Sequence, residues 1–249
     1  PSRHLGLSLD EDFCFEEFAD RVAELVEKYV DIDRLLELTK QVAPAALPMS
    51  VSHRTYRREP SFTVAIARDP AFNFMYEANI RYLHHLGEVT YFSPLADTSL
   101  PDTGFVYLPG GYPELYLAAL SANRPMLQSI RRYVENGGKL LAECGGMMYL
   151  CDEIRDKNGD VYPMAGVLHQ SATMENMKLR LGYRTLLYDD ARLKGHEFHY
   201  SRLVERQDPL PSCAVAYTAK GVETDTPLYH YKNVWAGYTH LYWADPAGN

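Results

Sequence analysis

The stretch KLLAECGGMMY at residues 139–149 constrains this chain more than any other part of its sequence. Its first residues are mostly apolar and predict a buried strand, while two glycines and a helical run follow Cys144 directly. A strand that turns abruptly into a helix holds a nucleophile at the carboxyl edge of a sheet. Glycines suit such a turn, because backbone without side chains tolerates unusual dihedral angles and lets a substrate approach. We therefore predict that Cys144 is a nucleophile.

The helix expected after Cys144 also bears on the state of the thiol. The positive end of a helix stabilises an anion, so we expect this helix to favour the thiolate over the thiol. The alternative is that Cys144 is a small buried core residue, as most free cysteines are. The Glu-Cys-Gly-Gly context favours the catalytic interpretation, and the rest of the chain has to decide between the two.

From Ser61 onward the chain alternates between strand-like and helix-like segments. We predict helices over 73–86 and 124–136, and strands over 62–67, 88–95, 104–109 and 139–143. Beyond residue 155, short tyrosine-rich runs predict antiparallel strands at 179–188, 196–204, 214–218 and 226–243. The fold class is therefore α/β, a doubly wound and mostly parallel sheet with antiparallel additions near the C-terminus. Ligands of such sheets bind at the carboxyl ends of the strands, where Cys144 falls.

Residues 1–59 have a different texture and predict a helical connector, followed by one domain over residues 60–249. Apolar residues recur at helical spacing over 15–30, and Asp31 can cap a second short helix. Residues 50–60 are polar and basic and predict a linker. The chain begins with Pro1 in mid-phrase, so we interpret it as a piece of a longer polypeptide.

Charge and cysteine content exclude some classes of protein. A net charge of −8 argues against a nucleic-acid surface, which needs clustered lysine and arginine. No run is long and apolar enough for a membrane span, and no signal-peptide pattern opens the chain. The four cysteines form no C-x-x-C pair and no disulfide-rich spacing, which indicates a reducing, cytoplasmic location and no zinc site.

The second chemical motif is LPGGYPE at residues 108–114, where a predicted strand ends in two glycines. Backbone N–H groups at such a strand end are free to point at a developing negative charge. An oxyanion hole needs two donors near the nucleophile, and the N–H groups of Gly111 and Gly145 are our candidates. The simpler interpretation is a strand-ending turn with a proline at the start of a helix. The predicted nucleophile one strand away favours the oxyanion hole.

A thiol nucleophile also needs a base, and the chain offers nine histidines. His196 and His199 alternate along a probable strand, with His196 and Phe198 on one face and Glu197 and His199 on the other. His240 lies in another strand-like run near the C-terminus. Sequence position does not choose among the three, because a catalytic histidine has to be close only in space.

Eight short motifs, taken together and in order, resemble one family. They are FNFMYEANIRYL, YFSPL, LPGGYPELY, AECGGMMYL, MAGVL, LGYR, GHEFHYS and GYTHLYW. Over roughly residues 61–243 the chain resembles the C-terminal domain of cobyrinic acid a,c-diamide synthases. These enzymes are class I (triad-type) glutamine amidotransferases, and the resemblance implies a flavodoxin-like sheet. Residues 1–59 look like the junction that follows the ATP-binding domain of those enzymes.

The resemblance implies a glutaminase that supplies ammonia for amidation of corrinoid carboxylates in cobalamin biosynthesis. It implies roles in catalysis or glutamine binding for a set of residues: Cys144 as nucleophile, His240 as catalytic histidine, Gly110, Gly111 and Gly145 around the oxyanion, and Glu197 and His199 near the glutamine site. ATP and magnesium would act on the separate N-terminal domain, and no cofactor or metal is expected in this chain. Its partners would be glutamine, that domain and a corrinoid; a homodimer is compatible with the sequence.

One departure from the wider class concerns what orients the catalytic histidine. Many class I amidotransferases carry His-x-Glu, whose glutamate orients the imidazole, whereas here Tyr242 stands at that position. A Cys–His dyad, or orientation by Glu197 or by a carbonyl, would have to serve instead. A weaker orienting group would make the isolated domain slow.

Other functions remain open at this point. Within the same class, the chain could belong to a nickel-sirohydrochlorin diamide synthase, a cobyric acid synthase or a cell-wall amidotransferase with a Cys–His dyad. From other classes, it could be a cysteine hydrolase of another amide, or a non-catalytic assembly module with an inert Cys144. The chain contains no G-x-x-x-x-G-K-[ST] phosphate loop, so we expect it to release ammonia without completing a synthase reaction.

Overall fold

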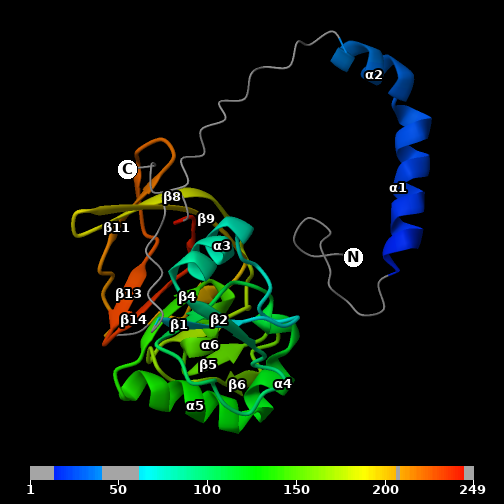
Figure 1. Cartoon of the computed structure of the whole chain (residues 1–249). Helices are drawn as coiled ribbons and strands as arrows, with labels where there is room; N and C mark the ends of the chain where they lie inside the picture. Colours follow the sequence, from blue (N-terminus) through cyan, green and yellow to red (C-terminus); the bar gives the residue numbers. More distant parts are fainter. Residues whose placement is uncertain (1–13, 41–61, 206–207, 244–249) are drawn as a thin grey trace. The chain divides into compact units, whose positions relative to one another are not determined.

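The structure, a computed structural model, describes residues 14–40, 62–205 and 208–243 (Figure 1). The chain divides into two units, Pro1–Thr55 and Tyr56–Asn249. The linker expected at 50–60 lies outside the described residues. In the described part, no helix has the length and apolar character that crossing a membrane requires.

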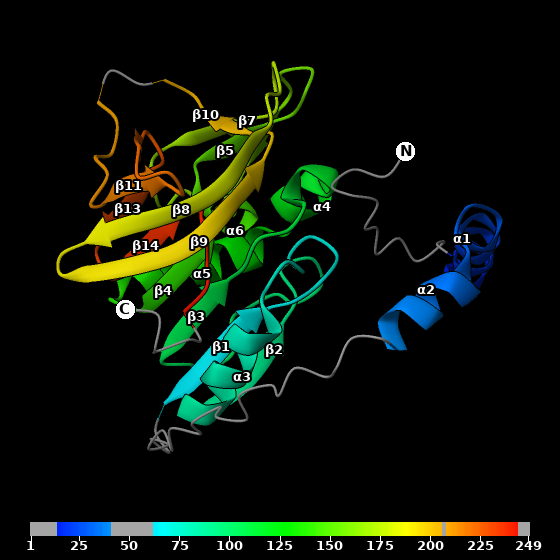
Figure 2. The ribbon, with the colours of Figure 1, turned by 90° about the horizontal axis from the view of Figure 1, so that it is seen from above.

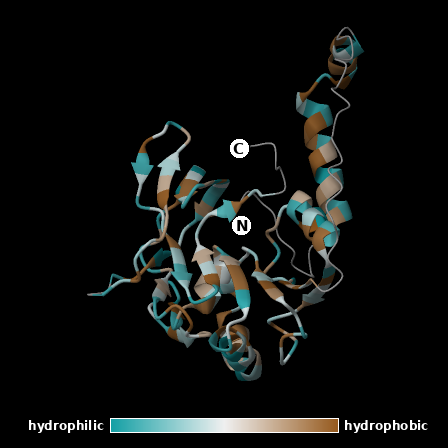
Figure 3. Cartoon of the chain, turned by 60° about the vertical axis from the view of Figure 1, so that its left-hand side comes forward, coloured by the Kyte–Doolittle hydropathy of each residue, from teal (hydrophilic) through white to brown (hydrophobic). Residues whose placement is uncertain are grey.

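The first unit contains two amphipathic helices, α1 (Phe15–Tyr29) and α2 (Ile32–Lys40). The side chain of Asp31 accepts a hydrogen bond from the Arg34 N–H at 2.9 Å, so the predicted cap at the start of α2 is confirmed. Neither helix buries a residue, and the apolar stripe of α1 is exposed. Figure 3 shows hydrophobic and hydrophilic residues alternating along the helices.

The second unit is built on a six-stranded central sheet. Its strands, from one edge to the other, are β13 (Leu228–Tyr231), β14 (Val234–Gly237), β4 (Lys139–Glu143), β3 (Phe105–Leu108), β1 (Thr63–Ala67) and β2 (Glu88–Phe92). All neighbouring pairs are parallel except β13 with β14. The five parallel strands therefore follow the 2-1-3-4-5 order of flavodoxin-like sheets, which confirms the predicted fold class.

Helices cover both faces of this sheet (Figure 1). On one face, α3 (Glu77–Leu86) packs Ile80 and Leu83 against Val64, Ile66 and Tyr107. On the other face lie η1 (Pro113–Leu115), α4 (Leu117–Ala122), α5 (Arg124–Glu135) and α6 (Gly145–Leu150). The two faces follow from the alternation of side chains along each strand and from right-handed crossovers on either side of β1 and β3.

Two smaller sheets extend this unit (Figure 2). One contains β10 (Arg202–Leu203), β7 (Ser171–Thr173), β5 (Glu153–Arg155) and β6 (Val161–Pro163). The other contains β12 (Glu223–Thr224), β11 (Val215–Thr218), β8 (Arg180–Tyr188), β9 (Ala191–His199) and β15 (His240–Leu241), all antiparallel. The antiparallel strands predicted at 179–188, 196–204 and 214–218 are thus confirmed. The run 226–243 was predicted wrongly in part, because β14 lies in the central sheet and pairs parallel with β4. The strands β5, β6 and β7 were not predicted.

The start of α3 corrects one prediction. The sequence pattern places a helix over residues 73–86, but α3 begins at Glu77. The backbone N–H of Phe74 instead donates to the Gly110 carbonyl at 3.0 Å, and this pairing holds the preceding residues extended. The buried residues of α3 are Asn79, Ile80 and Leu83. Tertiary contacts here override local helical periodicity.

Candidate active site

Cys144 stands at the abrupt turn between β4 and α6, as predicted. Its backbone has φ 47° and ψ −105°, a conformation that is rare for a residue with a side chain. Such a conformation costs about 1–3 kcal/mol and persists only where neighbouring structure enforces it. Here the Cys144 N–H donates to the Gly237 carbonyl at 2.7 Å, which ties the turn to the neighbouring strand β14.

The two glycines after Cys144 are required by close packing. A Cβ on Gly146 would overlap the Leu108 carbonyl at the end of β3. A Cβ on Gly145 would lie 2.7 Å from Pro113 Cδ and 3.2 Å from the backbone nitrogen of Gly111. The start of α6 therefore sits directly against the turn that follows β3.

This packing brings together the two predicted oxyanion donors. Gly111 lies against Gly145, and the Gly145 N–H points to the Cys144 sulfur, where it lowers the pKa of the thiol. The next N–H after Gly111, that of Tyr112, donates to the Ala71 carbonyl at 2.9 Å and fixes the turn. The backbones of the two predicted donors therefore lie next to each other at the turn that carries the thiol.

The protonation of Cys144 corrects a second prediction. The helix after Cys144 was expected to favour the thiolate, yet burial raises the pKa of the thiol well above its ordinary value. The nearby carboxylate of Glu114, on η1, raises this pKa further, and the Gly145 N–H only partly offsets both. Without a substrate, the buried sulfur is therefore a thiol, and its proton has to be transferred before it can act as a nucleophile.

His240 is held at the other side of the same turn. It begins β15, is buried, and lies with its ring on the backbone of Gly110, where a Cβ would overlap Cε1 and lie 2.8 Å from Nδ1. The Phe74 ring approaches it edge-on, with centroids 4.6 Å apart. The His196 ring stacks on it at 4.9 Å and 20°. Gly110 thus makes room for the imidazole.

His196 belongs to the surroundings of His240. The two residues are paired across β9 and β15, so their side chains share one face of the sheet. The Tyr76 hydroxyl lies 2.6 Å from His196 Nδ1, and burial lowers the pKa of His196. Phe74 and Tyr76 were not predicted as site residues, because the sequence pattern placed both in a helix.

Glu197 and His199 lie on the opposite face of β9. The Glu197 carboxylate forms an ion pair with Arg184 at 2.8 Å, and both side chains are nearly inaccessible to solvent. The His199 ring stacks on Tyr238 at 3.7 Å, and its Nδ1 donates to the Ser201 carbonyl at 2.9 Å. Burial lowers the pKa of His199 to about 4, so this imidazole is neutral near pH 7. The predicted alternation along β9 is confirmed, and it directs Glu197 to Arg184, away from the face that carries His240.

A buried carboxyl group that the sequence analysis did not identify lies directly before the nucleophile. Glu143 accepts a hydrogen bond from the Tyr107 hydroxyl at 2.7 Å and one from the Leu241 N–H at 3.1 Å. Burial raises its pKa to about 7, although both hydrogen bonds oppose the shift. The only signal in the sequence was an ionisable residue at the end of an apolar strand.

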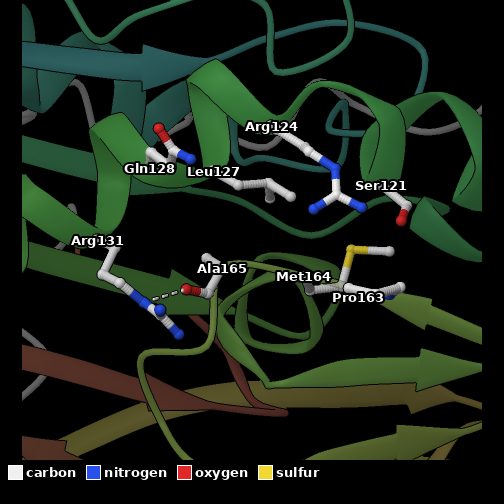
Figure 4. A pocket seen from close by; sticks show the side chains of 8 residues that line it. All are labelled: Ser121, Arg124, Leu127, Gln128, Arg131, Pro163, Met164 and Ala165. Atoms are coloured by element: carbon white, nitrogen blue, oxygen red, sulfur yellow. Dashed lines mark hydrogen bonds between the residues drawn. The ribbon is translucent and has the colours of Figure 1, made fainter.

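The cavity found in the structure lies away from the predicted site residues. A cavity of about 180 Å³ opens between α5 and the segment after β6 (Figure 4). Arg131 is engaged there by the carbonyls of Ala165 and Gly166, and none of the predicted site residues lines this cavity. Within residues 14–40, 62–205 and 208–243, no group of three or more histidine, cysteine, aspartate or glutamate side chains is arranged to hold a metal ion.

Comparison with known proteins connects this geometry to a family. The model of the CobB/CobQ-like glutamine amidotransferase domain matches residues 63–248. The chain is 37% identical over 262 residues to the cobyrinate a,c-diamide synthase of Dehalococcoides mccartyi (strain CBDB1), covering 97% of the chain and 55% of that protein. It is 36% identical over 249 residues to the hydrogenobyrinate a,c-diamide synthase of Pseudomonas aeruginosa, covering 97% and 54%.

The chain therefore spans about half the length of the curated relatives it matches. Among solved structures, PurLQS from Thermotoga maritima is similar to this chain with a TM-score of 0.49 and 15% identity, covering 72% of the chain and 87% of that structure.

Proposed function

Because the chain belongs to the family of CobB/CobQ-like glutamine amidotransferase domains, we propose that Cys144 and His240 are its nucleophile and base. One observation carries this proposal: the two residues meet on a single turn. Gly145, next to Cys144, lies against Gly111, and the ring of His240 lies against Gly110. The turn at Gly110 and Gly111 thus has both residues in its immediate surroundings, which supports their action as a thiol–imidazole pair.

The reaction begins with a protonated thiol. His240 accepts the proton of Cys144 as the sulfur attacks the carboxamide carbon of glutamine, and the N–H groups of Gly111 and Gly145 stabilise the resulting oxyanion. The C–N bond then breaks, His240 delivers its proton to the departing ammonia, and a thioester remains. Water, deprotonated by His240, hydrolyses the thioester to glutamate and the free thiol. Each oxyanion donor contributes about 10²–10³-fold to the rate of such reactions.

The raised pKa of Cys144 fits this sequence of steps. A thiol that is protonated without substrate does not react with unrelated electrophiles, because only the thiolate is nucleophilic. The negative charge of Glu114 contributes to this suppression. The α-ammonium group of a bound glutamine would neutralise part of that charge and ease ionisation of the thiol.

The names of the relatives support a proposal for the use of the ammonia. We propose that it amidates the a- and c-acetate carboxylates of a cobyrinate-type corrinoid, on a synthase domain that corresponds to the unmatched part of the relatives. ATP and magnesium would activate those carboxylates on that domain. The synthase domain and the corrinoid would be the partners of this chain, and the reaction would take place in the cytoplasm. The nickel-sirohydrochlorin and cobyric acid reactions are the alternatives, because the glutaminase site itself does not distinguish the macrocycle.

The test is covalent labelling with 6-diazo-5-oxo-L-norleucine, a glutamine-shaped electrophile, followed by intact-mass measurement and peptide mapping. We expect one adduct, on Cys144, that an excess of glutamine prevents and that Cys144→Ser abolishes. No adduct, or equal labelling of Cys14, Cys151 and Cys213, would overturn the assignment of the site. Adding the synthase domain with cobyrinate, hydrogenobyrinate or nickel sirohydrochlorin then identifies the acceptor by which product gains two amide groups.

A further inference from the structure

The strands that carry the two catalytic residues are joined by one side chain. Glu143 directly precedes Cys144, and its carboxyl group accepts the N–H of Leu241, which directly follows His240, at 3.1 Å. Both residues are buried. A single hydrogen bond therefore connects the neighbour of the nucleophile to the neighbour of the base.

Among the described residues, the two-residue strand β15 pairs with another strand on one edge only, so side-chain contacts matter for its position. Its partner on that edge is β9, through His240 with His196 and Leu241 with Gly195. On the other edge, side chains take the place of a strand. Glu143 accepts the Leu241 N–H, and Asn79 on α3 donates to the Leu241 carbonyl at 2.7 Å.

The two side chains that bind the Leu241 backbone, those of Glu143 and Asn79, form a clamp, and this clamp is held in place by further contacts. The second oxygen of the Glu143 carboxyl accepts the Tyr107 hydroxyl at 2.7 Å, and Tyr107 is fully buried on β3. Asn79, also fully buried, accepts the Trp243 N–H through its side-chain oxygen at 3.2 Å. The rotamers of both clamping side chains are thus fixed from the central sheet and from α3.

The geometry points to Glu143 as a positioning residue for His240, acting with Asn79 through the backbone of Leu241. This inference rests on the proposed roles of Cys144 and His240. Tyr242 stands where many class I enzymes have the orienting glutamate, and its side chain is partly exposed against Tyr76. Glu143 replaces that function by a different route, because it fixes the peptide beside the imidazole and leaves the ring itself to Gly110, Phe74 and His196.

The physical reason is that a reacting pair tolerates little displacement. A shift of about 1 Å between catalytic groups can cost about 10²-fold in rate. Without an acceptor at position 143, the buried Leu241 N–H would have no partner from the central sheet, and β15 would have to move or bend to satisfy it. Such a movement would displace His240 relative to Cys144, while Gly111 and Gly145, the proposed contacts of the substrate oxygen, would stay in place.

The test compares Glu143→Met, which removes the strong acceptor at similar volume, with Glu143→Gln, which keeps an acceptor oxygen but no charge. The measurement is inactivation by 6-diazo-5-oxo-L-norleucine, separated into the maximal rate and the concentration that gives half of it. We expect Glu143→Met to lower the maximal rate by more than about tenfold with the half-saturating concentration within about threefold. Glu143→Gln should stay within about threefold of the wild-type rate.

Two further variants keep the test decisive. Should Glu143→Met not fold, Asn79→Ala removes the other half of the clamp and should lower the maximal rate in the same way. Ile130→Ala, in the core on the opposite face of the sheet, destabilises the protein without touching β15 and serves as the matched control. Thermal unfolding of every variant is measured alongside.

The outcomes separate the inference from the function on which it rests. A folded Glu143→Met or Asn79→Ala with a wild-type maximal rate would overturn the inference. Equal losses in Glu143→Met and Glu143→Gln would also overturn it, because the charge and not the acceptor would then matter, as would an equal loss in Ile130→Ala. Absence of any adduct on wild-type Cys144 would instead overturn the proposed function, and the inference with it.

Discussion

The proposed nucleophile, Cys144, and the proposed base, His240, are positioned in two different ways. Cys144 is placed mainly by its own neighbours in the sequence, namely the strand before it, its positive φ and the glycines after it, and its N–H is bound by the Gly237 carbonyl of the adjacent strand. His240 is placed by residues from distant parts of the chain, among them Gly110, Phe74 and Glu143. Local sequence therefore builds one half of the site, and tertiary packing builds the other.

This difference predicts how each half fails. A change at the nucleophile should remove the chemistry and leave the fold, because the turn is defined by its backbone. A change around the base should leave the thiol in place and displace its partner. Four changes test this division, from the largest expected effect to the smallest.

Replacement of the nucleophile should have the largest effect on activity. We expect Cys144→Ala to lower glutaminase turnover by more than about 10³-fold, because no other group can form the thioester. The midpoint of thermal unfolding should change by only a few degrees, because alanine lacks only the sulfur atom and fits the same site without a clash. Cys213→Ser, at a half-buried cysteine outside the site, is the control and should keep wild-type turnover. Turnover that survives in Cys144→Ala would show that the nucleophile lies elsewhere.

A side chain at Gly110 should displace the base while leaving the nucleophile in place. The added Cβ of Gly110→Ala would overlap the His240 ring, so we expect turnover to fall by about 10²-fold. The matched control is Gly104→Ala, where the added Cβ would meet nothing nearer than 3.6 Å. Steady-state glutaminase assays and circular dichroism compare the two, and equal activities would contradict the placement of His240.

The buried carboxyl of Glu143 should give the protein a distinct pH dependence. Its pKa rises from 4.5 to about 7 on folding, because burial disfavours the carboxylate. Between these two values, the unfolded chain loses this proton while the folded chain keeps it, so stability falls as pH rises through that window. The loss amounts to roughly 3 kcal/mol and should be absent in Glu143→Gln.

The measurement is urea unfolding of wild type and Glu143→Gln at pH 5 and at pH 8. Between pH 5 and pH 8 the difference in unfolding free energy between the two proteins should shift by about 2–3 kcal/mol in favour of the variant at the higher pH. Taking a difference cancels the other titrating groups that the two proteins share. A difference that is the same at both pH values would mean that Glu143 is ionised in the folded protein throughout.

The smallest effect is expected at the outer edge of the base's surroundings. Tyr76→Phe removes the hydroxyl that lies 2.6 Å from His196 Nδ1 but keeps the ring packing. His196 would still stack on His240, so we expect turnover to fall by about threefold or less. Glutaminase kinetics would reveal the change, and a loss as large as that of Gly110→Ala would show that Tyr76 and His196 act on the reaction more directly.

The difference between local sequence and tertiary packing also explains which features could be predicted from the sequence. The strand–turn–helix around Cys144, the core strands and α5 follow from short-range patterns, and the structure confirms them. His240 was selected by family resemblance, because nothing in its neighbourhood distinguishes it from His196 or His199. The first turn of the helix predicted at 73–86 was wrong, since the pairing of Phe74 with Gly110 is a contact between segments that local periodicity cannot show.

Electrostatics was the least accessible property. The helix after Cys144 indicated a lowered thiol pKa, but the depth of burial, which sets the opposite direction, emerges only from the folded chain. The same holds for Glu143, whose partners Tyr107 and Leu241 come from two other strands. The strands β5, β6 and β7 were missed for another reason, because three residues are too few for an alternating pattern.

The bond between Glu143 and Leu241 also has a consequence for the order in which the enzyme is made. The two residues are 98 positions apart, and a ribosome adds about 5–20 residues per second. The turn that carries Cys144 is therefore synthesised roughly 5–20 s before His240, the proposed base. During that interval the proposed pair of Cys144 and His240 cannot form, because His240 and Leu241 have not yet been synthesised. Assembly of the proposed site therefore depends on a strand that is synthesised well after the turn of Cys144.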